Sequence, residues 1–243
     1  MKLSPLLTFV CACFAWPGFA TAQIRVTDQN FHAWLNYFGD HPLKSSRWQL
    51  HLESQLRRHE ILRWQQLLFR PGINYEVSPR LTLSAGYAFI HSYRYGEFPA
   101  AHNSNEHRLW YHSLFRYRSR HANWSSRVRF ENRFLEGFGE NGRHEFRFEN
   151  RIRGMQQVRI PLSEGTYLTA YNEVFIFVPP YRGSSAFDQN RAYIAYGRHL
   201  NRFWRLEAGY LNQALRHRLD GVLELNHTLV LSLYSHLPFG GFK

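Results

Sequence analysis

Apolar and polar side chains alternate with a period of two along most of this chain. In residues 47–57, tryptophan and leucine occupy the even positions 48, 50, 52 and 56, and glutamine, histidine, glutamate and arginine occupy the odd ones. Successive side chains of a strand point to opposite faces, so each such run predicts a strand with one apolar and one polar face. The other runs cover residues 31–38, 61–77, 81–89, 106–117, both arms of 125–154, 167–178, 189–196, 204–213 and about 222–236. Because no run keeps a helical period, the pattern predicts one all-β domain of consecutive hairpins.

The strongest pattern is the hairpin at 125–154, which contains one pentapeptide twice. Residues 129–133 and 147–151 both read Arg-Phe-Glu-Asn-Arg, and the segment between them is rich in turn formers. Charged residues occupy the odd positions and mainly aromatic residues the even ones. Like charges directly opposite each other destabilise a sheet, so we predict the register in which the numbers of paired residues sum to 278. Its pairs are Arg129 with Glu149, Glu131 with Arg147 and Arg133 with Glu145.

Alternation alone does not say whether the apolar faces fill a core or face lipid. Several runs reach the roughly nine to eleven residues that cross a bilayer at a tilt, and short turns alternate with longer loops. Aromatic residues also gather near strand ends, at Trp48, Tyr75, Tyr117, Trp124, Trp204, Tyr210 and Tyr234. We therefore predict a single antiparallel transmembrane β-barrel of 10–12 strands with a charge-paired arginine and glutamate interior. A secreted soluble β-barrel that binds a small ligand is the alternative.

Two details conflict with this barrel. Eleven runs are visible, whereas single-chain bacterial barrels have even strand numbers, so ten or twelve strands are expected. In addition, Asn132 and Asn150 fall on the predicted lipid-facing side, where an amide is unfavourable.

The first 22 residues carry a different pattern. Met1 and Lys2 precede an apolar run from Leu3 to Phe14, and Ala20-Thr21-Ala22 resembles a signal-peptidase site. Residues 1–22 are therefore expected to be a cleaved signal peptide and residues 23–243 the barrel domain. Both cysteines lie inside the leader, so the mature domain would have no thiol. A retained anchor and a lipoprotein modified at Cys13 are the alternatives.

The charge is strongly positive, with 30 basic and 18 acidic residues and a formal net charge of +12. Arginine dominates, because only Lys2, Lys44 and Lys243 are lysines. A nucleic-acid-binding protein would also be basic. Export and the alternation of arginine with glutamate argue against that partner, since arginine pairs well with carboxylates. Four arginines in predicted loops are candidates for binding lipopolysaccharide phosphates: Arg94, Arg182, Arg216 and Arg218.

Eight short sequence motifs follow one another along the chain. They lie at 67–75 (Leu-Leu-Phe-Arg-Pro-Gly-Ile-Asn-Tyr), 86–88, 106–110, 127–133, 172–175, 187–191, 209–213 and 226–227. Together they resemble the family called domain of unknown function 2490. The resemblance implies a β-barrel in the outer membrane of a Gram-negative bacterium, and it implies no reaction. The C-terminal residues 239–243 differ from the C-terminus typical of outer-membrane barrels, because the last residue is not aromatic.

The polar faces supply the candidate functional residues, as a ladder of charges lining the lumen. Interlocking charges would fill and brace a narrow barrel, and an excess of arginine would favour anions in a small pore. The ladder comprises Glu106, Arg108, Arg127, Arg129, Glu131, Arg133, Glu145, Arg147, Glu149, Arg151, Glu173 and Arg191. The predicted role is therefore structural, or that of a narrow passive channel that favours anions. Outer-membrane lipid, lipopolysaccharide and the outer-membrane assembly machinery are the expected partners.

An outer-membrane hydrolase of lipid or lipopolysaccharide is the other alternative. It would need a nucleophile, a base and an acid within hydrogen-bond reach. Its candidates are His102, Ser104, Glu106 and His107, but the alternation places His107 opposite Glu106. We therefore expect no catalytic residue and no enzymatic activity. The fourteen histidines lack the spacing of metal ligands, so no metal or cofactor is expected.

Overall fold

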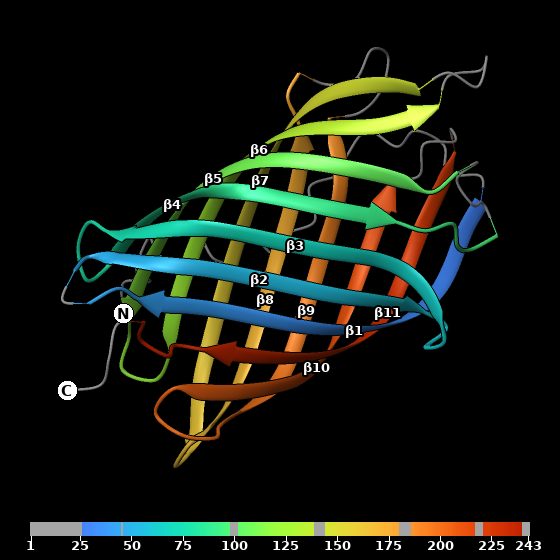
Figure 1. Cartoon of the computed structure of the whole chain (residues 1–243). Helices are drawn as coiled ribbons and strands as arrows, with labels where there is room; N and C mark the ends of the chain where they lie inside the picture. The colour runs from blue at the N-terminus through green and yellow to red at the C-terminus, as the bar shows by residue number, and fades with distance from the viewer. Residues whose placement is uncertain are drawn as a thin grey trace, which may run out of the picture.

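The computed structural model describes residues 26–44, 46–97, 102–138, 144–179, 186–216 and 221–239, and these form a closed β-barrel of eleven strands (Figure 1). The strands are β1 (Val26–Pro42), β2 (Trp48–His59), β3 (Arg63–Glu76), β4 (Leu81–Ser92), β5 (Ser104–Arg118), β6 (Asn123–Phe138), β7 (His144–Ser163), β8 (Thr166–Phe177), β9 (Phe187–His199), β10 (Trp204–Arg216) and β11 (Val222–Ser235). The all-β prediction is confirmed. The proposed leader, residues 1–22, lies outside the described residues. No helix among those residues is long and apolar enough to cross a membrane.

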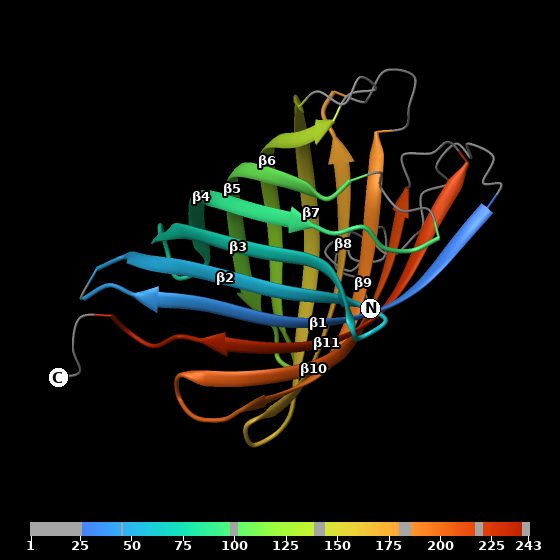
Figure 2. The ribbon, with the colours of Figure 1, turned by 45° about the vertical axis from the view of Figure 1, so that its right-hand side comes forward.

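The barrel closes through a parallel pair of strands. β1 runs beside β11 in the same direction, from Val26 opposite Val222 to Gly39 opposite Ser235 (Figure 2). The ten other neighbouring pairs are antiparallel. The expectation of an even strand number is therefore wrong for the described part of the chain. An even number is required only where the first and last strands pair antiparallel, and one parallel pair removes that requirement.

The two rims of the barrel differ in their connections. At one rim, here called the short-turn rim, strands are joined by residues 43–47, 77–80, 119–122, 164–165 and 200–203. At the other, the long-loop rim, the connections are residues 60–62, 93–103, 139–143, 178–186 and 217–221. From 77–80 onward the connections alternate between short turns and longer loops as predicted, but 60–62 is shorter than 43–47 before it.

The apolar faces of the strands point outward and the polar faces point inward. Leu83 is 46% exposed and Phe148 is 54% exposed on the outside, whereas Glu131 and Asn226 are fully buried on the inside. A soluble barrel has the opposite arrangement, with its apolar face in the core. The side-chain directions therefore contradict the soluble-barrel alternative.

The charged hairpin β6–β7 adopts a register other than the predicted one. Paired residue numbers sum to 282, so Glu131 lies opposite Arg151, and Arg129 lies opposite Arg153. The predicted sum of 278 is wrong by four residues. Direct cross-strand pairing does not decide the register, because an inward arginine also reaches carboxylates on other strands: Arg153 bonds Glu173 of β8 as well as Glu131. A four-residue shift keeps every side chain on its face, so the ionic face still lines the interior.

Four asparagines of the outer face bond to each other in two pairs. Asn132 Nδ2 donates to Asn150 Oδ1 at 2.7 Å across β6–β7. Asn172 and Asn190 exchange hydrogen bonds of 3.2 and 3.0 Å across β8–β9. Each amide therefore has a partner on a largely apolar surface, which lowers the cost of placing it there.

Removing one member of such a pair is expected to cost more than removing both. Asn132→Ala leaves the Asn150 amide without its partner, so we expect a loss of about 1–3 kcal/mol in the free energy of unfolding. The double variant Asn132→Ala, Asn150→Ala should lose less than the sum of the single variants. Urea titration of the refolded barrel in detergent measures this cycle, and strictly additive losses would contradict the pairing.

A tryptophan ring explains why the inner face of β4 carries small residues. Trp110 of β5 is fully buried and lies against two glycines, Gly72 of β3 and Gly86 of β4. A Cβ atom at Gly86 would stand 2.6 Å from Trp110 Cζ2 and 2.7 Å from Gly72 Cα. The glycines therefore provide the space that the indole fills.

Gly86→Ala is accordingly expected to destabilise the barrel by about 1–3 kcal/mol, because the added methyl group overpacks a site bounded partly by backbone. Gly154→Ala is the matched control, since a Cβ at Gly154 has nothing within 4 Å. Urea unfolding of the two variants in detergent gives the comparison. Equal stability of both variants would show that the indole moves aside freely.

Candidate functional site in the barrel lumen

The interior of the barrel contains a cavity of about 1290 Å³, and all eleven strands contribute to its lining. Arg80 and Arg118 line it at the short-turn rim, and Tyr95 and Arg216 line it at the long-loop rim. The cavity therefore extends along the barrel from one rim to the other.

Arginine is in excess on the cavity wall. Fifteen arginines and nine aspartate or glutamate residues line the cavity, with no lysine among them. Two further carboxylates, Glu131 and Glu207, lie fully buried on the inner face. Counting them leaves four arginine charges without a matching carboxylate. Charge of one sign in a narrow, low-dielectric passage concentrates counter-ions.

Glu131 of β6 is the centre of the ionic network. Its carboxylate accepts hydrogen bonds from Arg151 at 2.6 Å and Arg153 at 2.8 Å, both from β7. Arg70 of β3 and Arg108 of β5 approach it to 3.9 Å. A fully buried carboxylate is stable only with such compensation, because its desolvation is costly. Glu131 therefore links β3, β5, β6 and β7 through one side chain.

Further ion pairs extend this network around the wall. They join Glu173 to Arg127 and Arg153, Glu106 to Arg108 and Arg133, Glu149 to Arg133 and Arg147, Glu53 to Arg70, and Asp188 to Arg151. Most of these pairs hold charge-assisted hydrogen bonds below 3.2 Å, the length of strong contacts. The interior is thus charge-paired, as the fold prediction states.

The structure brings most of the predicted ladder together. Ten of its twelve residues, from β5, β6, β7, β8 and β9, are buried or half-buried on the inner face: Glu106, Arg108, Arg127, Arg129, Glu131, Arg133, Glu149, Arg151, Glu173 and Arg191. Arg147 is half-buried and forms an ion pair with Glu149, with Arg147 Nε 2.6 Å from Glu149 Oε1. Glu145 lies exposed opposite Gly137, and its predicted pair with Arg133 does not form, because Arg133 bonds Glu106 and Glu149.

Sequence reasoning missed other charged residues of the lumen wall. Glu53 and Arg57 of β2 and Asp188 of β9 all line the cavity. The odd parity of residues 47–57 could have identified the first two. Asp188 departs from the alternation, because it and Gln189 are both buried at the start of β9. Parity alone could not have found it.

Three lumen arginines contact aromatic rings instead of carboxylates. The guanidinium carbon of Arg57 lies 3.9 Å from the ring centroid of Trp34, and that of Arg129 lies 4.9 Å from Trp110. Arg191 lies between two rings, 5.2 Å from Trp34 and 4.8 Å from Phe175. None of these three forms an ion pair within the described residues. Cation–π contact stabilises them only partly, so they carry much of the excess charge.

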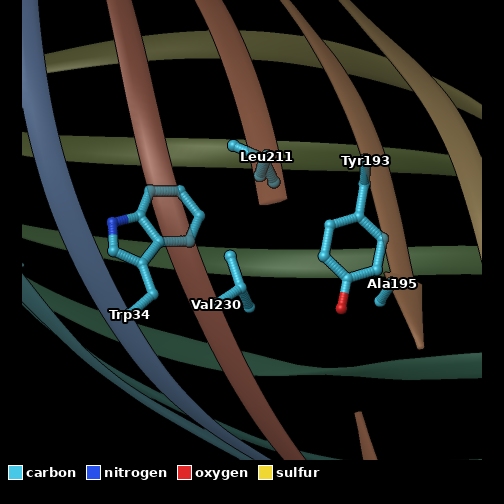
Figure 3. Packing of buried hydrophobic residues seen from close by; sticks show 5 residues of the cluster. All are labelled: Trp34, Tyr193, Ala195, Leu211 and Val230. Atoms are coloured by element: carbon cyan, nitrogen blue, oxygen red, sulfur yellow. The ribbon is translucent and has the colours of Figure 1, made fainter. Parts of the chain in front are cut away.

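The inner wall also carries an apolar patch that the alternation did not predict. Trp34, Tyr193, Ala195, Leu211 and Val230 form one buried cluster on β1, β9, β10 and β11 (Figure 3). They occupy inward positions that polar residues hold elsewhere in the barrel. All of them except Ala195 line the cavity. A second cluster, Leu68, Ala88, Ile90 and Trp110, fills the wall on the opposite strands, β3 to β5.

The β4–β5 connection narrows the long-loop rim. Tyr95 folds inward, and its hydroxyl donates to Glu224 Oε1 of β11 at 2.8 Å. Its ring lies 5.4 Å from the rings of both His32 and His59. Tyr95 therefore connects to β1, β2 and β11 inside the mouth of the barrel.

The residues considered for catalysis are not assembled into one site. Ser104 lies on the inner face, and the Glu106 carboxylate is held by Arg108 and Arg133. His107 points outward instead, where Nδ1 meets the Tyr87 hydroxyl and Nε2 lies 3.6 Å from Glu136. His102 is exposed in the connection before β5. Among the described residues, no group of three histidine, cysteine or acidic side chains is placed to hold a metal ion.

Comparison with known proteins places the chain beside others without an assigned role. The model of a family described as "Protein of unknown function (DUF2490)" matches residues 31–220. An uncharacterised protein of Methylorubrum extorquens is 26% identical over 175 residues, which are 70% of this chain and 72% of that protein. Among solved structures, the NanC porin aligns with a TM-score of 0.44 and 11% identity, over 71% of this chain and 77% of that one.

Proposed function

Since the chain belongs to DUF2490, a family of proteins of unknown function, we propose a role from the barrel itself: a narrow passive channel of the outer membrane that favours small anions. The cavity carries this proposal, because its lining includes residues of both rims and an excess of arginine. A pore lined by arginine lowers the energy of anions and raises that of cations.

The outer surface supports the proposed location. An apolar belt on a closed barrel suits lipid, because closure leaves no unpaired strand edge in the hydrocarbon. The long-loop rim would face the outside, as in known outer-membrane barrels, and the short-turn rim the periplasm. Outer-membrane lipid and lipopolysaccharide would then contact the belt, with the outer-membrane assembly machinery inserting it. Of the loop arginines suggested for lipopolysaccharide, Arg182 and Arg218 lie outside the described residues.

Conductance tests the proposal directly. The purified full chain, inserted into planar bilayers under a gradient of potassium chloride, is expected to give small steps of current. The reversal potential should show several-fold preference for chloride over potassium, because the lumen carries excess positive charge. A preference for potassium would contradict the anion channel.

A closed structural barrel is the second candidate, favoured by side chains that cross the lumen. Arg70 of β3 reaches both Glu53 of β2, at 2.7 Å, and Glu131 of β6, at 3.9 Å. Arg159 of β7 approaches Glu207 of β10 to 3.7 Å. The contacts of Arg70 with Glu131 and of Arg159 with Glu207 brace strands that are not neighbours. Bilayers that stay silent while the protein is folded and inserted would favour this role.

We propose no catalytic activity for either role. The relevant assay is acyl release from lipid or lipopolysaccharide by the purified barrel, with none expected. Release that disappears in Ser104→Ala or His102→Ala would overturn this part of the proposal.

A further inference from the structure

One wall of the cavity places guanidinium groups beside an apolar surface. Trp34 of β1 lies at the boundary. Arg57 stands 3.9 Å from its ring centroid and Arg191 stands 5.2 Å from it. Beyond Trp34 lie Leu211 and Val230, with Tyr193 at the far side of the patch (Figure 3). All six side chains line the cavity.

Neither arginine has an ion-pair partner of its own among the described residues, because Glu173, which lies opposite Arg191 across β8–β9, pairs with Arg127 and Arg153 instead. Arg57 donates only to neutral amides, to Gln55 Oε1 at 3.0 Å and to Gln66 Oε1 at 2.6 Å. Arg191 forms no ion pair among the described residues, and its buried Nε has no hydrogen-bond partner there. Desolvated cations without counter-ions are costly, so an anionic group held between them would lower the free energy. Arginine binds a carboxylate through two parallel hydrogen bonds.

The apolar side of the wall suits an apolar ligand group, in contrast to the arginines. Leu211 is 1% exposed and Val230 is 5% exposed, yet both border the cavity. The Tyr193 hydroxyl is buried there. A passage for inorganic ions alone gains nothing from such a surface. Small-molecule sites, in contrast, combine apolar walls with a few placed polar groups.

We propose that this wall binds a small aromatic carboxylate, with the carboxylate between Arg57 and Arg191 and the ring on Leu211, Val230 and Tyr193. The inference rests on the proposed channel, because the lumen is the route by which the anion reaches the wall. A polyhydroxylated sugar acid fits less well, since the patch offers one hydroxyl to its many polar groups. An inorganic anion would bind the arginines and make no contact with the patch.

Calorimetric titration of the full chain in detergent micelles tests the site with three probes. Benzoate carries both ligand groups, acetate only the carboxylate and benzamide only the uncharged ring. Benzoate is expected to bind at least tenfold more tightly than either of the others. Arg191→Gln should weaken benzoate binding at least tenfold, and Leu211→Asn should weaken binding of benzoate while leaving that of acetate unchanged. Arg202→Gln, which changes an exposed arginine of the β9–β10 turn outside the cavity lining, is the matched control with unchanged binding.

Equal affinities for benzoate and acetate would overturn the proposal, and so would benzoate binding that survives Arg191→Gln. Heat-modifiable gel migration establishes that each variant is folded, and Arg57→Gln serves if Arg191→Gln does not fold. The readout is independent of conduction. Benzoate binding with silent bilayers supports the site and overturns the channel, whereas conductance without benzoate binding overturns the site alone.

Discussion

Replacing Glu131 by glutamine is expected to lower the free energy of unfolding by about 3 kcal/mol or more, the typical cost of removing one partner from a buried charge network. Glutamine keeps the side-chain volume and part of the hydrogen bonding of Glu131. The loss of stability therefore reports the effect of removing the negative charge. Arg151 and Arg153 bond this carboxylate directly, and Arg70 and Arg108 lie 3.9 Å from it. Without it, guanidinium groups from three strands would repel one another in a desolvated interior.

Glu145→Gln is the matched control for that loss, because Glu145 is an exposed glutamate on the same hairpin. Its substitution should change stability by no more than about 0.5 kcal/mol. The double variant Glu131→Gln, Arg151→Gln should recover part of the loss by removing one uncompensated cation. Urea unfolding in detergent or lipid vesicles measures all three. A Glu131→Gln barrel as stable as the control would mean that water enters and screens the network.

The second large effect concerns selectivity. Arg129→Glu is expected to reduce the preference for chloride over potassium at least about fivefold, since two unit charges interact by roughly 1 kcal/mol at 4 Å even in water. Arg129 is 1% exposed, and two of its guanidinium nitrogens have no hydrogen-bond partner. The new carboxylate would face basic neighbours, because Arg129 is paired with Arg153 across β6–β7. Folding should therefore survive the substitution.

Arg202→Glu makes the same change of charge outside the lumen. Arg202 is exposed in the β9–β10 turn, where its guanidinium lies over Phe203. The reversal potential of the Arg202→Glu variant should match that of the unmodified protein. If both variants shift the reversal potential equally, the selectivity comes from the overall charge of the protein and not from the lumen wall.

The two-residue period was sufficient to predict the fold class and which side chains share a face of each strand. Strand length, the alternation of turns with loops and the positions of the aromatic residues were needed to predict which face points outward. The period predicted strands near all eleven observed positions, and ten of the twelve ladder residues lie on the inner face. Parity survives small errors in strand limits, because each residue keeps its face wherever the strand begins. The first strand shows the limit of this reasoning: β1 spans Val26–Pro42, well beyond the aromatic run at 31–38.

The register and the closure could not be predicted from neighbouring strands alone. Charge complementarity between two strands favoured the sum of 278, but the lumen brings carboxylates such as Glu173 to arginines of β6 and β7. The direction of β1 against β11 depends on residues almost 200 apart in the chain, and no local pattern reports it. The apolar patch was not predicted for a related reason. Trp34, Leu211 and Val230 are scattered over three strands and meet only when the barrel closes.

The parallel seam between β1 and β11 has a topological consequence. In an even-stranded barrel both chain ends leave from the same side, whereas here β1 starts at the long-loop rim and β11 finishes at the short-turn rim. A reporter joined ahead of Val26 and one joined behind Ser235 would therefore sit in different compartments of a membrane-embedded barrel. The ends could not be linked by a short peptide to make a circular permutant, because such a peptide would have to cross the full height of the wall.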